Sequence, residues 1–417
     1  MINLIKKIVK NKSILIFALF VILFLPSTIY LPAESSRRLV VSAVGVDKID
    51  NQIELSVLMV IPKSSGNIGN NYQLISQKGK TLAEALEKMG TSIGKQISFA
   101  HCEIIITSKA ILDENLATYL DFFTRTNNLT SNADLVSADN SKQILEANIS
   151  ISKEFSLGLK DILTNNKKAV GIDNINVDSF YKSYLSSNNA YLLPYISLEK
   201  TSNQSSNTSS SNQGDNENSE NSPSATSTQQ TPQNNKQQLA YDGSFCLLKN
   251  GRLVETIDKN HTLALNMINK KVNKGLIQLK NVTDKSFNNA DVSLEILDKK
   301  IKQNFQFVNN IPHLTYDIFL FVKLEEVFAP NFNSKALNTV FDIFGEPTFS
   351  KTVDKINSSL ANIIDISKKH SVDILNIVQQ AKTTHFKEYK NYINKHTPED
   401  LIKNTVVTCN YEFAIRN

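Results

Sequence analysis

The segment LVVSAVGVDKIDNQIELSVLMVI, residues 39–61, carries the clearest structural signal in the chain. Two runs rich in apolar residues, 39–46 and 52–61, lie on either side of the polar link DKIDN. Every second position of the later run is apolar, namely Ile53, Leu55, Val57, Met59 and Ile61. A period of two is typical of a β-strand, and Asp and Asn favour turns, so the segment predicts a β-hairpin.

Helices and strands alternate after this hairpin. Thr81 and Glu84 stand at the spacing of a capping box, which predicts a helix start. The apolar face of that helix contains Leu82, Leu86, Met89 and Ile93. Further patterns predict strands at 102–107 and 133–138, and helices at 115–125 and 141–148. This order predicts an α+β (mixed α/β) fold class, in which helices cover a mixed sheet.

Residues 201–238 differ from the rest of the chain in composition. Ser, Asn, Gln and Thr dominate, and Ala225 is the one aliphatic residue among them. So few apolar side chains cannot offset the entropy cost of ordering, which predicts a disordered, solvated linker. The linker separates two predicted domains, residues 34–200 and 239–417, each a mixed sheet covered by helices.

The second predicted domain begins with another hairpin, with strands at 241–248 and 252–256 around the turn Lys249-Asn250-Gly251. The remaining patterns predict strands at 292–296, 316–327 and 407–415, and a helical stretch at 351–395. Thr397-Pro398 should stop this stretch, because proline cannot continue a helix. We expect the apolar stripe of the stretch to pack on its own sheet rather than face a partner.

The first 33 residues predict a membrane anchor. Four lysines, Lys6, Lys7, Lys10 and Lys12, precede an uninterrupted apolar run at 14–25, which residues 29–31 extend toward spanning length. Basic residues resist crossing a membrane, so the N-terminus should stay in the cytoplasm and the rest lie outside. An uncleaved signal anchor is favoured over a cleaved signal peptide, because Leu31 is a poor residue for the −3 position of a cut after Ala33.

Several classes of function are excluded by composition and spacing. The net charge is +5 without a dense Lys/Arg block, which argues against a nucleic-acid partner. The three cysteines are far apart, so neither a disulfide framework nor a zinc site is expected. Gly79-Lys80-Thr81 lacks the first glycine of a phosphate-binding loop, since Leu74 stands at that position.

No catalytic group is predicted either. His101 and Cys102 are adjacent on an expected strand and should point to opposite faces, so they do not form a nucleophile–base pair. His370 and His385 are expected to face solvent. The prediction is therefore a protein that is not an enzyme, with no catalytic, cofactor-binding, metal-binding or lipidation residue and no cofactor.

Six short segments occur in an order that carries a family resemblance. They are RRLVVSAVGVD at 37–47, GKTLAEAL at 79–86, ISFAHCEIII at 97–106, LDFFTR at 120–125, GSFCLLKNGRLV at 243–254 and KHSVDIL at 369–375. Together they resemble the Ger(x)C family, the C subunits of nutrient germinant receptors in spore-forming bacteria. The resemblance covers roughly residues 37–415 apart from the linker.

Two departures from the family pattern indicate a divergent member. Family members are typically lipoproteins with an acylated cysteine just after the signal peptide, whereas no cysteine precedes Cys102 here. The apolar segment at 14–31 would replace the acyl chain as the anchor. The family's late tryptophan is also absent, and Tyr389 or Tyr392 would fill its place.

The resemblance implies a non-enzymatic extracytoplasmic subunit that supports receptor assembly or signalling in spore germination. Its implied partners are two integral membrane subunits, one of the A type and one permease-like of the B type, in the spore inner membrane. The alternative is an extracytoplasmic module that binds a solute or an envelope polymer. An exported hydrolase is a further rival, and it would need a catalytic constellation that the sequence lacks.

Overall fold

The computed structural model describes residues 38–61, 71–126, 129–147, 158–159, 161–164, 175–186, 190–200, 237–269, 275–284, 287–329 and 345–415. The predicted anchor at 1–33 lies outside these ranges, as do residues 201–236 of the predicted linker. Within the described ranges, no helix combines the length and the apolar character that a membrane span requires.

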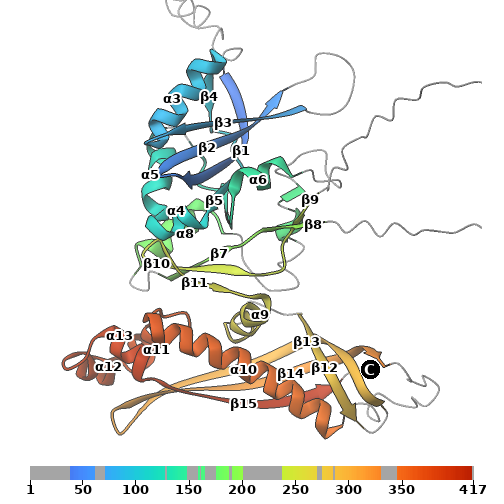
Figure 1. Cartoon of the computed structure of the whole chain (residues 1–417). Coiled ribbons are helices and arrows are strands. Elements are labelled where there is room, and N and C mark those ends of the chain that lie inside the picture. Colours follow the sequence, from blue (N-terminus) through green and yellow to red (C-terminus); the bar gives the residue numbers. More distant parts are fainter. Residues whose placement is uncertain are drawn as a thin grey trace, which may run out of the picture.

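The N-terminal lobe is built on a six-stranded mixed sheet (Figure 1). Its main path runs β3-β2-β1-β5-β6, and the short β4 pairs with the start of β1. The pairs β1–β2 and β2–β3 are antiparallel, whereas β4 and β5 run parallel to β1 and β6 runs parallel to β5. The strands are β1 Arg38–Ile49, β2 Gln52–Ile61, β3 Asn71–Gly79, β4 Gln96–Ser98, β5 Ile104–Ser108 and β6 Asp134–Ala138.

The predicted hairpin at 39–61 is confirmed. Asp50 and Asn51 form its turn with φ of 50° and 62°, the left-handed region that Asp and Asn tolerate best after glycine. Both faces of β2 are buried, because helices cover both sides of the sheet. Leu55 belongs to the core on one side and Leu58 to the core on the other.

The helices of this lobe are α3 Leu82–Ile93, α4 Lys109–Glu114, α5 Leu116–Thr126, α6 Ser141–Glu146 and α8 Val177–Tyr184. The predicted start of α3 is confirmed, since the backbone N–H of Glu84 donates to Thr81 Oγ1 at 3.2 Å. The Glu84 carboxylate accepts from the N–H of Lys80 at 2.8 Å rather than from that of Thr81. The cap therefore reaches one residue further back than the predicted capping box.

The strands on either side of the predicted linker pair with each other. β8 (Ser197–Lys200) pairs with β9 (Gln237–Ala240), so that Lys200 is the cross-strand partner of Gln237. A three-stranded sheet, which we call the junction sheet, has the order β11-β10-β7. Its strands are β7 Ala190–Pro194, β10 Phe245–Lys249 and β11 Arg252–Ile257, so the second predicted hairpin is confirmed. The domain limits at 200 and 239 stay a prediction.

The C-terminal lobe is a four-stranded sheet in the order β12-β13-β14-β15, and the helices that the structure describes in this lobe pack on one face of it (Figure 1). β15 runs parallel to β14, and the other pairs are antiparallel. The strands are β12 Gly275–Asp284, β13 Phe287–Val308, β14 Ile311–Phe328 and β15 Val406–Ile415. The helices are α9 Lys259–Ile268, α10 Glu346–His370, α11 Ile377–Thr384, α12 Phe386–Ile393 and α13 Pro398–Asn404.

Two predictions for the C-terminal lobe need correction. The stretch at 351–395 is helical as predicted, but it is divided into α10, α11 and α12. The first break contains Ser371 and Asn376, with left-handed φ values of 53° and 57°, and the second is at His385, with φ of −134°. Pro398 begins α13 instead of only ending a helix, since a first-turn position needs no N–H donor and Thr397 caps the helix. The stripe of α10 does pack on its own sheet, where Ile356, Leu360 and Ile363 are buried.

Burial of Tyr241 predicts a loss of stability at alkaline pH. Burial raises the pKa of Tyr241 above its usual value near 10, and the neighbouring Asp242 raises it further. Above pH 10, Tyr241 therefore ionises in the unfolded chain at a lower pH than in the folded protein. Its contribution to the free energy of unfolding falls as the pH rises. Tyr241→Phe should leave stability at pH 8 nearly unchanged. Urea unfolding at pH 8 and at pH 11 measures the difference. Between these pH values, the free energy of unfolding of Tyr241→Phe should fall by about 1 kcal/mol less than that of the wild type.

Candidate functional site: buried carboxylates and the junction of the two lobes

The histidines and cysteines considered in the sequence do not come together. His101 lies exposed in a turn rather than on a strand, and Cys102 is buried with its thiol 3.4 Å from the carbonyl of Ile104. His370 and His385 are half-buried, so the expectation that they face solvent is wrong. His385 packs edge-on against Phe305, at 5.9 Å between ring centroids. Within the described ranges, no three His, Cys, Asp or Glu side chains form a group able to hold a metal ion.

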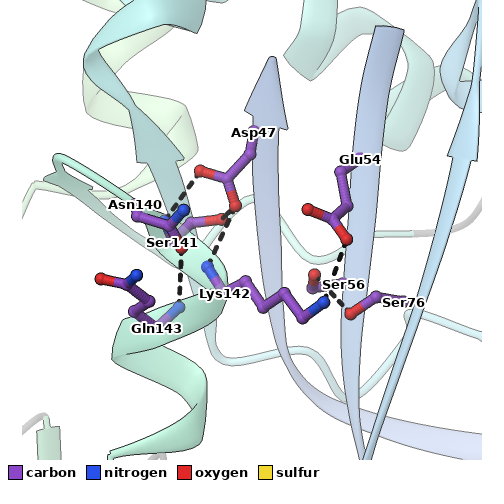
Figure 2. Close-up of polar contacts among 8 residues, drawn as sticks. All are labelled: Asp47, Glu54, Ser56, Ser76, Asn140, Ser141, Lys142 and Gln143. Atoms are coloured by element: carbon purple, nitrogen blue, oxygen red, sulfur yellow. Dashed lines mark hydrogen bonds and ion pairs between the residues drawn. The ribbon is translucent and has the colours of Figure 1, made fainter. Parts of the chain in front are cut away.

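A buried carboxylate lies where β1 meets the start of α6 (Figure 2). Asp47 is 1% exposed, and its carboxylate accepts three hydrogen bonds. The donors are the Ser141 N–H at 2.8 Å, the Ser141 hydroxyl at 2.7 Å and the Lys142 N–H at 3.0 Å. Asp47 thus accepts hydrogen bonds from backbone N–H groups that have no partner within α6. Asp47 lies far from this helix in the sequence.

A second buried carboxylate stands directly across the hairpin from Asp47. Glu54 is the cross-strand partner of Asp47 and is 6% exposed. Like charges at opposed positions destabilise a sheet unless a cation intervenes. Lys142 supplies that cation, with its Nζ 3.1 Å from Glu54 Oε1 while its N–H donates to Asp47 (Figure 2).

Gly45 explains why α6 can approach β1 so closely. A Cβ at this position would lie 2.5 Å from the Ser141 hydroxyl and 2.9 Å from a methyl group of Leu145. The Gly-Val-Asp sequence at 45–47 therefore combines the space for a helix with the acceptor that caps it. In the sequence these residues were identified only through the family resemblance, because Ser141 is too remote for any local pattern to indicate the contact. The donors of Ser141 and Lys142 and the carboxylates of Asp47 and Glu54 bind one another. The role of this arrangement is therefore to attach α6 to the sheet.

The junction sheet contributes to the cores of both lobes. Alternate residues of β10 point to opposite faces. Leu247 belongs to the C-terminal core, whereas Cys246 and Leu248 belong to the N-terminal core. All three side chains are 0% exposed. One strand therefore links the packing of the two lobes.

The turn of the second hairpin is held between two helix ends, one from each lobe. Lys249 Nζ donates to the carbonyls of His370 and Ser371, at 3.2 and 3.0 Å, where α10 ends. A positive charge is stabilising at this end of a helix. On the other side the carbonyl of Gly251 accepts from the N–H of Leu116 at 2.8 Å, where α5 begins.

Gly251 and Glu255 complete this contact. Gly251 has φ of 76°, and a Cβ there would lie 2.4 Å from the Asn115 amide oxygen, so glycine is required on both grounds. Glu255 of β11 faces the same end of α10, with its carboxylate 3.6 Å from His370 Nε2 and 3.9 Å from Lys369 Nζ. Two segments of the resemblance, 243–254 and 369–375, thus meet at the junction.

The Lys249 contact gives a prediction for the junction. Lys249→Met keeps most of the apolar stem and removes the ammonium group from the end of α10. The free energy of unfolding should fall by about 1 kcal/mol, the size of a charge–helix interaction in a half-buried setting. Arg252→Met is the matched control, because this exposed residue of the same hairpin loses the same charge. A thermal unfolding curve in which both variants match the wild type would contradict the prediction.

These features define a class: a two-lobed mixed α/β protein whose buried polar groups fix helices to sheets and one lobe to the other. Residues 33–198 match the family model for the spore germination protein N-terminal domain. Residues 242–417 match the model for spore germination B3/GerAC-like proteins, C-terminal. The chain belongs to this family of spore germination proteins, the Ger(x)C family, as its motifs predict.

One solved structure supports the same fold. The chain is similar to the crystal structure of the GerBC protein, with a TM-score of 0.51 and 14% sequence identity. The match covers 90% of this chain and 97% of that chain. No curated protein matches the chain. The predicted fold class, mixed α/β with sheets covered by helices, is confirmed, and the anchor stays a prediction.

Proposed function

We propose that this protein is a membrane-associated, non-enzymatic subunit of a nutrient germinant receptor, and that it supports receptor assembly or signalling. Family membership over both lobes is the observation that carries the proposal. The predicted anchor at 1–33 would hold the lobes on the outer side of the spore inner membrane. Confinement to that surface raises their effective concentration near A-type and permease-like B-type subunits.

The junction suggests how such a subunit would pass on a signal. The lobes share the junction sheet, and Lys249 and Gly251 contact helices of different lobes. A displacement of one lobe would therefore act on the other through backbone and core contacts rather than through a flexible connection. Packed interfaces of this kind favour discrete arrangements over continuous deformation.

Deletion of the gene tests the proposal. Spores that lack the protein should lose germination with at least one nutrient and still germinate with a trigger that bypasses nutrient receptors. Affinity purification of the tagged protein from spore membranes should recover two integral membrane subunits. Normal germination with every nutrient tested, together with recovery of no membrane subunit, would contradict the receptor role.

A pocket in the C-terminal lobe bears on the alternative of a solute-binding module. It lies between α9, α10 and β12, and Leu263, Met267 and Ile277 are part of its lining. Its volume of about 30 Å³ leaves room for one or two water molecules. This pocket by itself gives no support to solute binding.

A further inference from the structure

The two edges of the C-terminal sheet differ in how they are protected. At the β12 edge, Lys355 Nζ donates to the carbonyl of Gln278 at 2.6 Å. Lys351 Nζ donates to the carbonyl of Asn281 on the same strand. Lysines that cover a sheet edge prevent the addition of another strand.

The β15 edge has no comparable protection within the described residues. β15 pairs with β14 over its whole length, from Val406 to Ile415, without a bulge, and no other described strand pairs with it. Its sequence VVTCNYEFAI contains one charged residue, Glu412, and neither proline nor glycine. A long, regular strand with so little charge is suited to pair with another strand.

The core beneath β15 is incomplete at this edge. The core-facing side chains of the neighbouring β14 are at most 2% exposed, namely Leu314, Tyr316, Ile318, Leu320 and Val322. Their counterparts on β15 are only partly buried, namely Val407, Cys409, Tyr411 and Phe413. An added strand would therefore extend both the hydrogen-bond ladder and the core.

We propose that β15 pairs antiparallel with β15 of a second copy of this chain, about a two-fold axis at Asn410. Such an axis keeps the helices of both copies on the same face of a continuous sheet. It places Val407 opposite Phe413 and Cys409 opposite Tyr411 on the core side. On the outer side it sets the Glu412 carboxylate opposite the Thr408 hydroxyl, which can donate a hydrogen bond to it.

Self-complementarity is the reason for choosing a second copy as the occupant, because the axis sets two identical rows of partly buried core-side residues against each other. The one charge of β15, on Glu412, lies away from the axis, so the two carboxylates do not oppose each other. Asn410 already donates its amide to Asp317 at 2.8 Å, which leaves Thr408 as the residue that can serve Glu412. When two copies of β15 pair in this way, the Thr408 hydroxyl of each copy can donate to the Glu412 carboxylate of the other.

A cysteine scan of the full-length protein in detergent tests the proposal. Opposed residues of an antiparallel pair have Cα atoms about 4.5–5.5 Å apart, within the range of a disulfide. Asn410→Cys should give a disulfide-linked dimer on a non-reducing gel. Thr408→Cys alone should stay monomeric, because its two copies would lie about 14 Å apart along the strands. A mixture of Thr408→Cys and Glu412→Cys chains should cross-link.

Sedimentation provides a second measurement. The wild type should sediment as a dimer, and Asn410→Lys should sediment as a monomer because two ammonium groups would then face each other at the axis. Gln306→Lys is the control, since it adds the same charge at an exposed position of β13 and should stay dimeric. A monomeric wild type with no Asn410→Cys dimer would overturn the proposal, and so would cross-linking of Asn410→Cys only to a different protein.

Discussion

Asp47→Ala should lower the free energy of unfolding of the N-terminal lobe by about 3 kcal/mol, the scale for disrupting a buried charged network. The carboxylate is 1% exposed and accepts from two donors of Ser141 and from the N–H of Lys142. Alanine cannot accept a hydrogen bond, so the two buried donors of Ser141 and the half-buried N–H of Lys142 would lose their acceptor. The start of α6 would then lose its attachment to β1.

Chemical unfolding monitored by circular dichroism measures this loss. Asp47→Asn keeps the shape and one acceptor oxygen, so we expect it to lose about half as much stability. Asp113→Ala is the matched control, because Asp113 is an exposed residue of α4 and its removal should change stability by less than about 0.5 kcal/mol. If Asp47→Ala behaved like this control, the proposed role of the carboxylate as an anchor of α6 would be wrong.

Local patterns predicted the elements of the N-terminal lobe better than their contacts. The hairpin at 39–61 and the start of α3 depend on residues a few positions apart, which periodicity and capping can reveal. The attachment of Asp47 to Ser141 joins residues that are 94 positions apart. No spacing rule connects them, so the site at the start of α6 could not be derived from the sequence.

The C-terminal lobe illustrates the other limit of sequence patterns. The apolar period continues past residue 371, yet α10 ends before Ser371 and α11 begins only after Asn376, and neither glycine nor proline marks this break. Asp373, buried between them, accepts from the backbone N–H groups of Ile377 and Val378 at 2.6 and 2.9 Å and so begins α11. These local capping bonds, together with the contacts of Lys249 at the end of α10, outweigh the helical preference of the segment.

The junction sheet leads to a second large effect. Leu247→Ala and Leu248→Ala remove the same atoms from neighbouring positions of one strand, and each should lower stability by about 2–5 kcal/mol. The affected lobe should differ, because Leu247 packs in the C-terminal core and Leu248 in the N-terminal core. Both side chains are 0% exposed, so neither site has water to compensate for the lost contacts.

Hydrogen exchange followed by mass spectrometry would separate the two effects. Leu247→Ala should speed exchange first in peptides of α10 and β14, and Leu248→Ala first in peptides of α5 and α8. Leu247→Met and Leu248→Met are the controls, because a side chain of similar volume should cost less than about 1.5 kcal/mol. If both alanine variants gave the same exchange profile, the prediction that each variant destabilises one lobe first would be wrong. The two lobes would then open as one cooperative unit although their cores are separate.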